Sequence, residues 1–318
     1  MTDGPLWIRE AEVATLMQLP DAIDALEHGL RAEAHGEALN MVKAHVAWDG
    51  GNTLHAIGAV FPARGIAGTK TWTHTSRGAA PLLILFDSND GSLKAVIEAF
   101  ALGQLRTGGI SGVATRYLAA ADADELAIIG TGKQAFMQVA AVAAVRDLNR
   151  VRVFSPNPAH RSEFVTRLQS ELGCSVVAAD SVAAAVDGAP IITLVTRATA
   201  PFLSAAMIAA GAHINAVGAI TPDRVELADD IFPRCNRVVV DSLPSVQKLS
   251  RELIDHYGSR QDWSTVLPLS QVVATRFARQ PGTDLTLFKA MGMGLSDLSL
   301  GIEVYEAARR RRIVNGEC

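Results

Sequence analysis

The feature that most constrains the fold of this 318-residue chain is a series of short apolar segments that alternate with helical patterns after Asp124. Segments typical of strands occur at Glu125–Ile129, Val151–Phe154, Ser175–Ala178, Pro190–Val195, His213–Val217 and Val238–Asp241. Apolar spacing predicts helices between the first three of these strands, over Gln134–Leu148 and Pro158–Leu172. Strands that alternate with helices are typical of a parallel sheet with helices on both faces. We therefore predict a doubly wound α/β domain in this part of the chain.

The chain before Asp124 has a different pattern. Residues 6–34 predict a short strand and an amphipathic helix, and residues 41–86 alternate apolar with polar positions between glycine-rich breaks. This alternation indicates a mostly antiparallel sheet. Asp90-Gly91 is a hairpin turn signal. We predict a further helix from about Val96 to Ala120 and a last one over Leu287–Arg312 that returns to the first domain.

The turn between the first strand and the first helix of the α/β region reads Gly130-Thr131-Gly132-Lys133-Gln134-Ala135. Gly130 permits a tight turn, Gly132 lets the backbone approach a phosphate, and Ala135 keeps the helix close to the strand. The N-terminus of that helix offers free N–H groups and the positive end of its dipole. Because a strand precedes the turn and a helix follows it, we interpret it as the pyrophosphate-binding turn of a dinucleotide site. The residues expected to contact the cofactor here are Gly130, Thr131, Gly132, Gln134 and Ala135.

The end of the second strand bears on which dinucleotide is bound. Sites for NAD usually carry an acidic residue there, which accepts hydrogen bonds from the ribose 2′-OH. This chain has Ser155-Pro156-Asn157 instead, with His160 and Arg161 close behind. We therefore predict that Ser155, Asn157 and Arg161 favour NADP(H), with NAD(H) as the alternative. A purely solvated role for Arg161 also remains open.

Composition excludes several other classes of protein. Lys and Arg total 29 against 33 Asp and Glu, so the formal charge is −4 and no basic surface for nucleic acid is expected. The three cysteines are scattered and form no C-x-x-C pair, so we expect no metal site. The N-terminus lacks a signal-peptide pattern, and no apolar run is long enough for a membrane span. We expect a cytoplasmic protein with no membrane or nucleic-acid partner.

The chain resembles the ornithine cyclodeaminase/mu-crystallin family along nearly its whole length. The matching stretches are Gly68-Thr69-Lys70, Leu85-Phe86-Asp87 through Gly91, Leu105-Arg106-Thr107, the Gly130–Ala135 turn, His213 through Gly218, Glu226-Leu227, Val240-Asp241-Ser242, and Phe288-Lys289 to Asp297-Leu298. The resemblance implies a homodimer. It also implies a Rossmann-type doubly wound parallel sheet over residues 119–287, inserted in an α+β substrate-binding and dimerisation domain made of residues 1–118 and 288–318.

The resemblance also implies two catalytic residues, Lys70 and Arg106, which hold the carboxylate of a substrate. Guanidinium binds carboxylate through two hydrogen bonds, and ammonium adds a point charge and a proton source. Lys43 falls at the position of another family arginine. His55 falls at a substrate-side polar position, with a structural histidine as the alternative.

Four further residues fall where the family lines the nicotinamide or ribose. Thr196, Gly218 and Arg224 are expected to contact the cofactor, and Met291 is expected on the substrate side. A surface role for Arg224 and a core role for Met291 remain open.

One departure from the family pattern is informative, because Ile220 stands where the cyclodeaminases have an aspartate. An isoleucine does no acid–base chemistry. Reduction of an imine mainly needs orientation, carboxylate capture and one proton source. We therefore predict NAD(P)H-dependent reduction of an α-imino acid to the L-amino acid, the substrate being linear or cyclic, such as pyrroline- or piperideine-2-carboxylate. Ornithine cyclodeaminase, an alanine dehydrogenase-like oxidoreductase and a cofactor-binding protein remain as alternatives.

Overall fold

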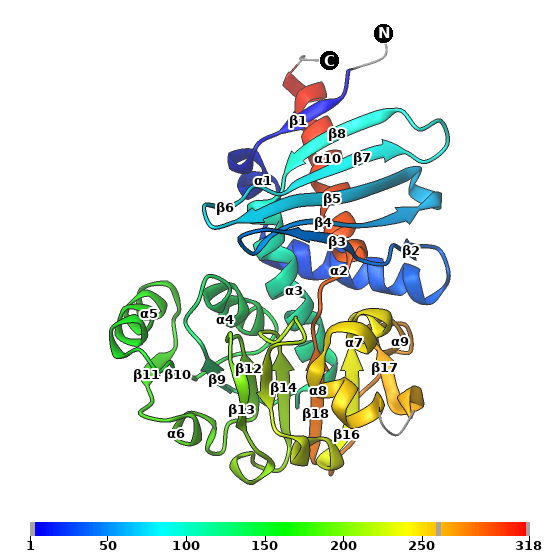
Figure 1. Cartoon of the computed structure of the whole chain (residues 1–318). Coiled ribbons are helices and arrows are strands. Elements are labelled where there is room, and N and C mark those ends of the chain that lie inside the picture. Colours follow the sequence, from blue (N-terminus) through cyan, green and yellow to red (C-terminus); the bar gives the residue numbers. More distant parts are fainter. Residues whose placement is uncertain (1–3, 259–261, 316–318) are drawn as a thin grey trace. The chain divides into compact units, whose positions relative to one another are not determined.

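The computed structural model describes residues 4–258 and 262–315 and divides into two compact units (Figure 1). Unit 1 comprises residues 1–109 and 292–318, and unit 2 comprises residues 110–291. The sequence analysis predicted borders after residues 118 and 287, whereas the two units divide after residues 109 and 291. The first differs because the division falls within helix α3 (Phe100–Leu118). The second differs because strand β18 (Leu285–Lys289) is paired along its whole length in the sheet of unit 2.

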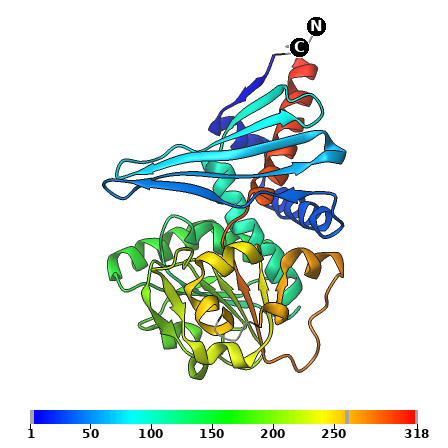
Figure 2. The same ribbon diagram turned by 45° about the vertical axis from the view of Figure 1, so that its right-hand side comes forward.

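Unit 1 is built on an eight-stranded sheet in the order β1-β8-β7-β5-β4-β2, with β3 paired to β4 and β6 paired to β5. All pairs are antiparallel except β1 with β8, so the predicted mostly antiparallel sheet is confirmed. In Figure 2 the hairpin of β3 and β4 extends, together with the end of β5, beyond the other strands of this sheet. The strands are β1 (Leu6–Ile8), β2 (Leu39–Asn40), β3 (Ala44–Trp48), β4 (Asn52–Phe61), β5 (Ile66–Thr75), β6 (Gly78–Ala79), β7 (Leu82–Asp87) and β8 (Leu93–Glu98).

The helices of unit 1 are α1 (Glu10–Leu16), α2 (Leu19–Ala34), the first half of α3, α10 (Gly294–Asn315) and the 3₁₀ turn η1 (Pro62–Arg64). Helix α10 packs against α2 and against strands β4, β5 and β7. It begins close to β4 because Gly294 faces Gly58, where a Cβ atom would overlap the backbone. This close approach brings the first turn of α10 against the strands of the sheet.

Two helix predictions for unit 1 were partly wrong. Residues 6–34 contain two helices, because Pro20 lies in the first turn of α2 and begins a new helix there. The helix predicted from Val96 begins only at Phe100, because Val96 and Ile97 belong to β8, which pairs with β1 and β7. A short apolar run does not distinguish a strand from a helix by its periodicity.

Unit 2 contains an all-parallel sheet of eight strands in the order β11-β10-β9-β12-β14-β18-β16-β17, which confirms the predicted doubly wound sheet. Strands β13 and β15 form a separate parallel pair. The strands are β9 (Glu125–Ile129), β10 (Arg150–Phe154), β11 (Ser175–Ala178), β12 (Ile191–Leu194), β13 (Thr199–Leu203), β14 (Ala212–Ala216), β15 (Val225–Leu227), β16 (Cys235–Val240), β17 (Val266–Pro268) and β18.

Helices complete unit 2 and enclose its core. The central strands are buried on both faces, and alternate side chains of β12 enter two different apolar clusters: Ile192 and Leu194 one, Ile191 the other. No helix of the described residues is long and apolar enough to cross a membrane. Besides the second half of α3, the helices are α4 (Ala135–Ala143), α5 (Pro158–Glu171), α6 (Val182–Val186), α7 (Leu243–Leu249), α8 (Arg251–Leu253) and α9 (Leu269–Ala274), with η2 (Ala205–Met207), η3 (Asp229–Arg234), η4 (Ile254–Gly258) and η5 (Trp263–Thr265).

The helix predicted over Leu287–Arg312 was wrong at its start. Residues Leu285–Lys289 form β18, which lies between β14 and β16, and the helix begins at Gly294. Every residue of β18 is buried, so its sequence shows no alternation of apolar and polar positions that would identify a strand.

Candidate functional site

Unit 1 holds a buried cluster of two cations and one carboxylate. Lys70 lies on β5, Arg106 on α3 and Asp297 on α10. The Nζ atom of Lys70 is 2.5 Å from Oδ1 of Asp297, and Nε of Arg106 is 3.4 Å from the same oxygen. The side chain of Asp297 is fully buried, whereas that of Arg106 is 18% exposed. With both cations protonated, the cluster carries one positive charge that Asp297 does not balance.

The surroundings of Lys70 lower its pKa. Burial lowers the pKa of Lys70 to about 8; Asp297 opposes the shift, whereas Arg106 and Lys43 add to it. The ammonium therefore stays mostly protonated at neutral pH but releases its proton more readily than an exposed lysine. The ring of Trp72 lies on the same face of β5, with its centroid 5.2 Å from Nζ.

Two glycines leave room for the cations of this cluster. A Cβ atom at Gly292 would lie 2.9 Å from Nη1 of Arg106, and Gly292 has a φ of +82°, where a side chain would be strained. A Cβ atom at Gly103, one helical turn before Arg106, would lie 3.9 Å from Nζ of Lys70. A side chain at Gly292 would therefore crowd the guanidinium of Arg106, whereas a Cβ atom at Gly103 would only touch Lys70.

His55 lies on β4 in a row of stacked rings, between His45 of β3 and Trp72 of β5. Its Nε2 atom is 2.7 Å from Oγ1 of Thr53, and its Nδ1 atom is buried without a hydrogen-bond partner. Burial, together with the charges of Lys43, His45 and His74, lowers the pKa of His55 to about 4, so the ring is neutral at pH 7. The charge of Lys43 acts on both His55 and Lys70, so the fold of unit 1 brings all three predicted residues near one another.

In unit 2, the two glycines of the Gly130–Ala135 turn differ in the space around them: Gly130 is packed against the neighbouring loop, and Gly132 is not. Gly130 has a φ of +112°, and a Cβ atom there would lie 2.7 Å from the carbonyl oxygen of Val195. No heavy atom lies within 4 Å of the position that a Cβ atom of Gly132 would take. Ala135 begins α4 and is fully buried, and Oε1 of Gln134 is buried without a partner. An open glycine beside a helix N-terminus fits the pyrophosphate of a dinucleotide.

The end of β10 carries a cation and no acid. The carbonyl oxygen of Ser155 accepts a hydrogen bond of 3.2 Å from Nη1 of Arg161, whose guanidinium also lies 5.7 Å from the ring centroid of Phe154. The side chain of Asn157 caps α5 by accepting from the N–H of His160 at 3.1 Å. These contacts hold Arg161 against the end of the strand.

Thr196 and Gly218 lie in the loops that follow β12 and β14. The order in which the strands follow one another reverses between β9 and β12, and open α/β sheets bind their ligands at the carboxyl ends of strands at such a point. Arg224 is half-buried just before β15. Met291 is 4% exposed and belongs to the apolar core of unit 2, against which Ile220 also packs. This position agrees with the core alternative that the sequence left open for Met291.

The model of the ornithine cyclodeaminase/mu-crystallin family matches residues 6–312. This chain belongs to that family. A Δ1-pyrroline-2-carboxylate reductase of Bacillus cereus is 31% identical over 235 residues, which cover 73% of this chain and 72% of that protein. The family resemblance predicted from the sequence is therefore confirmed.

Solved structures of similar proteins have the same fold. The Δ1-pyrroline-2-carboxylate reductase of Thermococcus litoralis, in complex with NADH and L-proline, is 25% identical with a TM-score of 0.90, over 96% of this chain and 98% of that one. An archaeal alanine dehydrogenase dimer with bound NAD is also 25% identical, with a TM-score of 0.89 over 97% of each chain. These likenesses agree with the Rossmann-type sheet of unit 2.

The sequence analysis missed the role of Asp297, which it named only within a matching stretch. The signal was present, because an aspartate stands among Leu295, Leu298 and Leu300 at the start of an apolar helix. A carboxylate buried in such a position needs a cation partner. The sequence does not say which cation, because Lys70 is 227 positions away.

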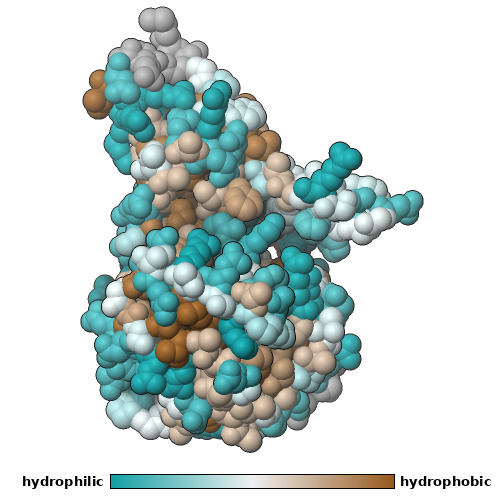
Figure 3. All heavy atoms as spheres, turned by 90° about the vertical axis from the view of Figure 1, so that its left-hand side faces the viewer, coloured by the Kyte–Doolittle hydropathy of each residue, from teal (hydrophilic) through white to brown (hydrophobic). Residues whose placement is uncertain are grey.

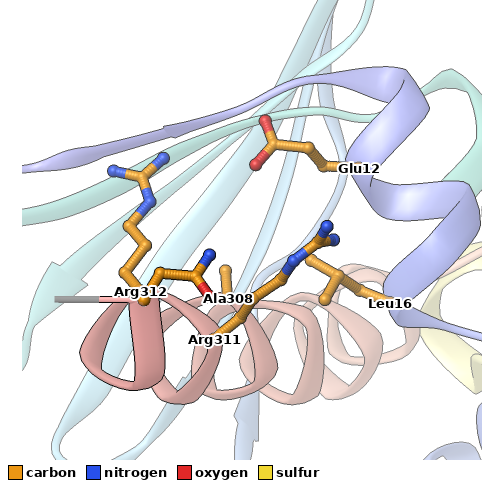
Figure 4. A pocket seen from close by; sticks show the side chains of 6 residues that line it. Glu12, Leu16, Ala308, Arg311 and Arg312 are labelled. Atoms are coloured by element: carbon orange, nitrogen blue, oxygen red, sulfur yellow. The ribbon is translucent and has the colours of Figure 1, made fainter. Parts of the chain in front are cut away.

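Unit 1 also has a pocket of about 200 Å³ between α1 and α10 (Figure 4). Oε2 of Glu12 accepts from the N–H of Arg9 at the start of α1, and Arg312 donates to the carbonyl oxygen of Trp7. These side chains therefore serve the packing of the chain around them, and no predicted site residue lines the pocket. The pocket is lined by Glu12, Leu16, Ala308, Arg311, Arg312 and Asn315.

Within residues 4–258 and 262–315, no group of three or more His, Cys, Asp or Glu residues could hold a metal ion.

Proposed function

We propose that this family member catalyses the NAD(P)H-dependent reduction of an α-imino acid to the L-amino acid. The observation that carries the proposal is the unbalanced positive charge of the Lys70–Arg106–Asp297 cluster. A buried, unbalanced cation is costly, and the carboxylate of a substrate would neutralise it. The relatives named above support it: two are Δ1-pyrroline-2-carboxylate reductases, one of them in complex with NADH and L-proline, and the third is an alanine dehydrogenase with bound NAD.

Each residue of the cluster has a distinct proposed role. The partly exposed guanidinium of Arg106 binds the substrate carboxylate, and Nζ of Lys70 adds a second positive charge. A nicotinamide cofactor supplies the hydride for the imine carbon. Lys70 supplies the proton for the imine nitrogen, because its lowered pKa makes the proton available near neutral pH. Asp297 orients Lys70 and favours its protonated form.

The cofactor is proposed to bind at the turn of unit 2 through Gly130, Thr131, Gly132, Gln134 and Ala135. We place Thr196, Gly218 and Arg224 on the nicotinamide and ribose side. The missing acid after β10, together with the position of Arg161, supports a preference for NADP(H) over NAD(H). Relatives with bound NADH or NAD support the dinucleotide but do not support this preference.

Ile220 argues against the cyclodeaminase alternative. Its side chain packs against the apolar core of unit 2 and has no group that could exchange a proton with a substrate amine. Imine reduction needs a single proton source, and Lys70 meets that need.

We also propose that the protein is a homodimer whose interface includes the β3–β4 hairpin. Val46 and Leu54 face each other across that hairpin and are 57% and 44% exposed. Trp48 at the end of β3 is 46% exposed. Exposed apolar side chains that gather on one hairpin are typical of a protein–protein interface. The face shown in Figure 3 is mainly teal and white where the sheet projects to the right of the view, so these apolar side chains form no broad hydrophobic patch on that face.

The activity is tested with a panel of cyclic and linear α-imino acids, each assayed with NADPH and NADH. We expect oxidation of the cofactor with at least one substrate, and a loss of about 100-fold or more in kcat/KM for Arg106→Ala. Arg64→Ala is the matched control, since Arg64 pairs with Glu303 and Glu306 on the surface of unit 1. No oxidation with any substrate would overturn the proposal. Ammonia and proline formed from ornithine without added reductant would favour the cyclodeaminase.

The cofactor preference has its own test within the same assay. Arg161→Ala should lower kcat/KM for NADPH about tenfold or more and leave that for NADH nearly unchanged, because only NADPH carries the 2′-phosphate. Arg167→Ala is the control on the same helix, since Arg167 lies over the ring of Phe136. Equal effects of Arg161→Ala on both cofactors would contradict the preference.

A further inference from the structure

Unit 2 contains a buried ionic network that the proposed chemistry does not use. Glu226 lies on β15, Glu252 on α8 and Lys289 at the end of β18, and all three are at most 5% exposed. Nζ of Lys289 is 2.6 Å from Oε2 of Glu252. Oε1 of Glu252 accepts the backbone N–H groups of Glu226 and Leu227, at 2.7 and 3.0 Å. Glu252 thereby ties β15 to the end of β18.

Glu226 in turn holds two loops together through its two carboxylate oxygens. Oε1 accepts from the backbone N–H and from the hydroxyl of Thr196, at 2.7 and 2.8 Å. Oε2 accepts from the N–H groups of Gly218 and Ala219, at 3.0 and 3.1 Å. One carboxylate therefore joins the loop that follows β12 to the loop that follows β14.

The two loops touch so closely that only glycine fits at the contact. A Cβ atom at Gly218 would overlap the backbone of Thr196 and Oε1 of Glu226. The loop after β12 also meets the dinucleotide turn, because a Cβ atom at Gly130 would lie 2.7 Å from the carbonyl oxygen of Val195. The loops after β9, β12 and β14 thus form one continuous group at the carboxyl ends of neighbouring strands.

Stabilisation of the fold does not by itself explain this ionic network. The ammonium of Lys289 pairs with Glu252 and acts on Glu226 only through its charge. Apolar residues of similar volume often stabilise a protein as well as such a buried ionic group. Burial raises the pKa of Glu226, against the effect of Lys289 and of the Thr196 donors. What this carboxylate achieves is geometric: it accepts four hydrogen bonds from two loops, which apolar side chains could not do.

We infer that Glu226 is a positioning residue for the nicotinamide end of the cofactor, acting through the loops 195–198 and 217–221. Ligands of open α/β sheets bind at the carboxyl ends of strands, where these loops lie. Glu252 and Lys289 fix the strand that carries Glu226. The inference rests on the proposed dinucleotide site and adds to it residues that need not touch the cofactor.

The test compares NADH with ADP-ribose, which lacks the nicotinamide. In Glu226→Gln the side-chain amide nitrogen is a donor, so one of the two loops loses its acceptor. We expect NADH affinity and kcat for imine reduction to fall tenfold or more, while ADP-ribose affinity stays within twofold of the wild type. A general loss of folded protein would lower both affinities together, so this split separates positioning from a merely structural role.

Two further variants keep the result decisive. Glu226→Asp retains the charge but is one methylene shorter, so it cannot reach both loops; the same split should appear in smaller measure. Asp284→Asn is the control, because it weakens a bidentate pair with Arg234 next to the amino end of β18 and should leave kcat unchanged. Should Glu226→Gln not fold, the outcome with Glu226→Asp decides.

Two outcomes separate the failure of this inference from that of the proposed function. A wild-type protein that binds neither NADH nor ADP-ribose would overturn the dinucleotide site itself. A wild-type protein that binds both and turns over, with folded Glu226 variants that match it in NADH affinity and kcat, would overturn only the positioning role.

Discussion

At the scale of single residues, the carboxylate of Asp297 determines how Lys70 behaves. Burial alone would favour the neutral amine, which neither attracts a carboxylate nor donates a proton to an imine. Asp297 offsets part of that effect, so the pKa of Lys70 stays at about 8. The same oxygen lies near Nε of Arg106, which leaves the outer nitrogens of the guanidinium for a ligand.

A pH profile follows from this arrangement. Because protonated Lys70 is the proposed proton source, kcat/KM for imine reduction should fall as the pH rises through about 8. Asp297→Asn removes the charge that raises the pKa of Lys70, so the fall should move to lower pH by about 1 unit or more. The profile is measured between pH 6 and pH 10, a range chosen to span the change in charge by roughly two units each way.

The control for this profile is Asp87→Asn, which breaks a partly exposed pair with Lys94 in the same sheet. It should leave the alkaline limb where it is in the wild type. If Asp297→Asn also leaves the limb unmoved, Lys70 is not the group that titrates.

At this scale the sequence identified Lys70 and Arg106 as site candidates but not the residue that joins them. Lys70 stands in a glycine-rich strand and Arg106 in an apolar helix, and both are unusual places for a cation. Asp297 joins them only because α10 packs on β4, β5 and β7. That packing has no local signal in the sequence.

At the scale of elements, the two glycines of the β9–α4 turn are needed for different reasons. Gly130 is required by the backbone, since its φ is +112° and the carbonyl oxygen of Val195 lies where a side chain would begin. Gly132 has a conformation and surroundings that would accept a methyl group. We infer that a glycine is needed at this position because the phosphates of the proposed dinucleotide approach the backbone there.

The two glycines should therefore respond differently to alanine. Gly130→Ala should lower the free energy of unfolding by about 1–3 kcal/mol, because it strains the backbone. Gly132→Ala should change that free energy by less than about 0.5 kcal/mol. It should nevertheless weaken NADH binding, because the methyl group stands where the phosphates approach the backbone.

Urea unfolding and a fluorescence titration with NADH measure these two effects. Each variant is the control for the other. Unchanged NADH affinity in Gly132→Ala would show that the turn does not bind the pyrophosphate.

The elements themselves were predicted well where a local pattern defines them. Strands β9 and β11 have the predicted bounds, because glycine or acidic residues limit each short apolar run. The last three residues of strand β18, Leu287–Lys289, were predicted as helix, because a strand that is buried on both faces shows no alternation of apolar and polar positions. Only the partners of that lysine show why a charge is tolerated there.

At the scale of the whole molecule, the proposed homodimer depends on the exposed apolar residues of the β3–β4 hairpin. The double variant Val46→Glu with Leu54→Glu places two acidic groups on that surface. We expect it to be a monomer in solution, because like charges would face each other in a symmetric interface. Light scattering after size-exclusion chromatography measures the mass.

Val177→Glu is the matched control for the dimer. Val177 is 41% exposed on β11, at the edge of the sheet in unit 2, and its substitution should leave the mass unchanged. A wild-type protein that is already a monomer would contradict the proposal, and so would a double variant that remains a dimer.

The sequence by itself determined the parts of this protein that depend on neighbours along the chain. The parallel α/β region, the antiparallel sheet before it and the phosphate-type turn all follow from periodicity and from glycine at defined spacings. Tertiary structure decided the rest: the pairing of Asp297 with Lys70, the strand at Leu285–Lys289 and the Glu226 network. These depend on contacts between residues far apart in the chain. Such contacts follow from strand register and helix packing, which no local pattern of side chains records.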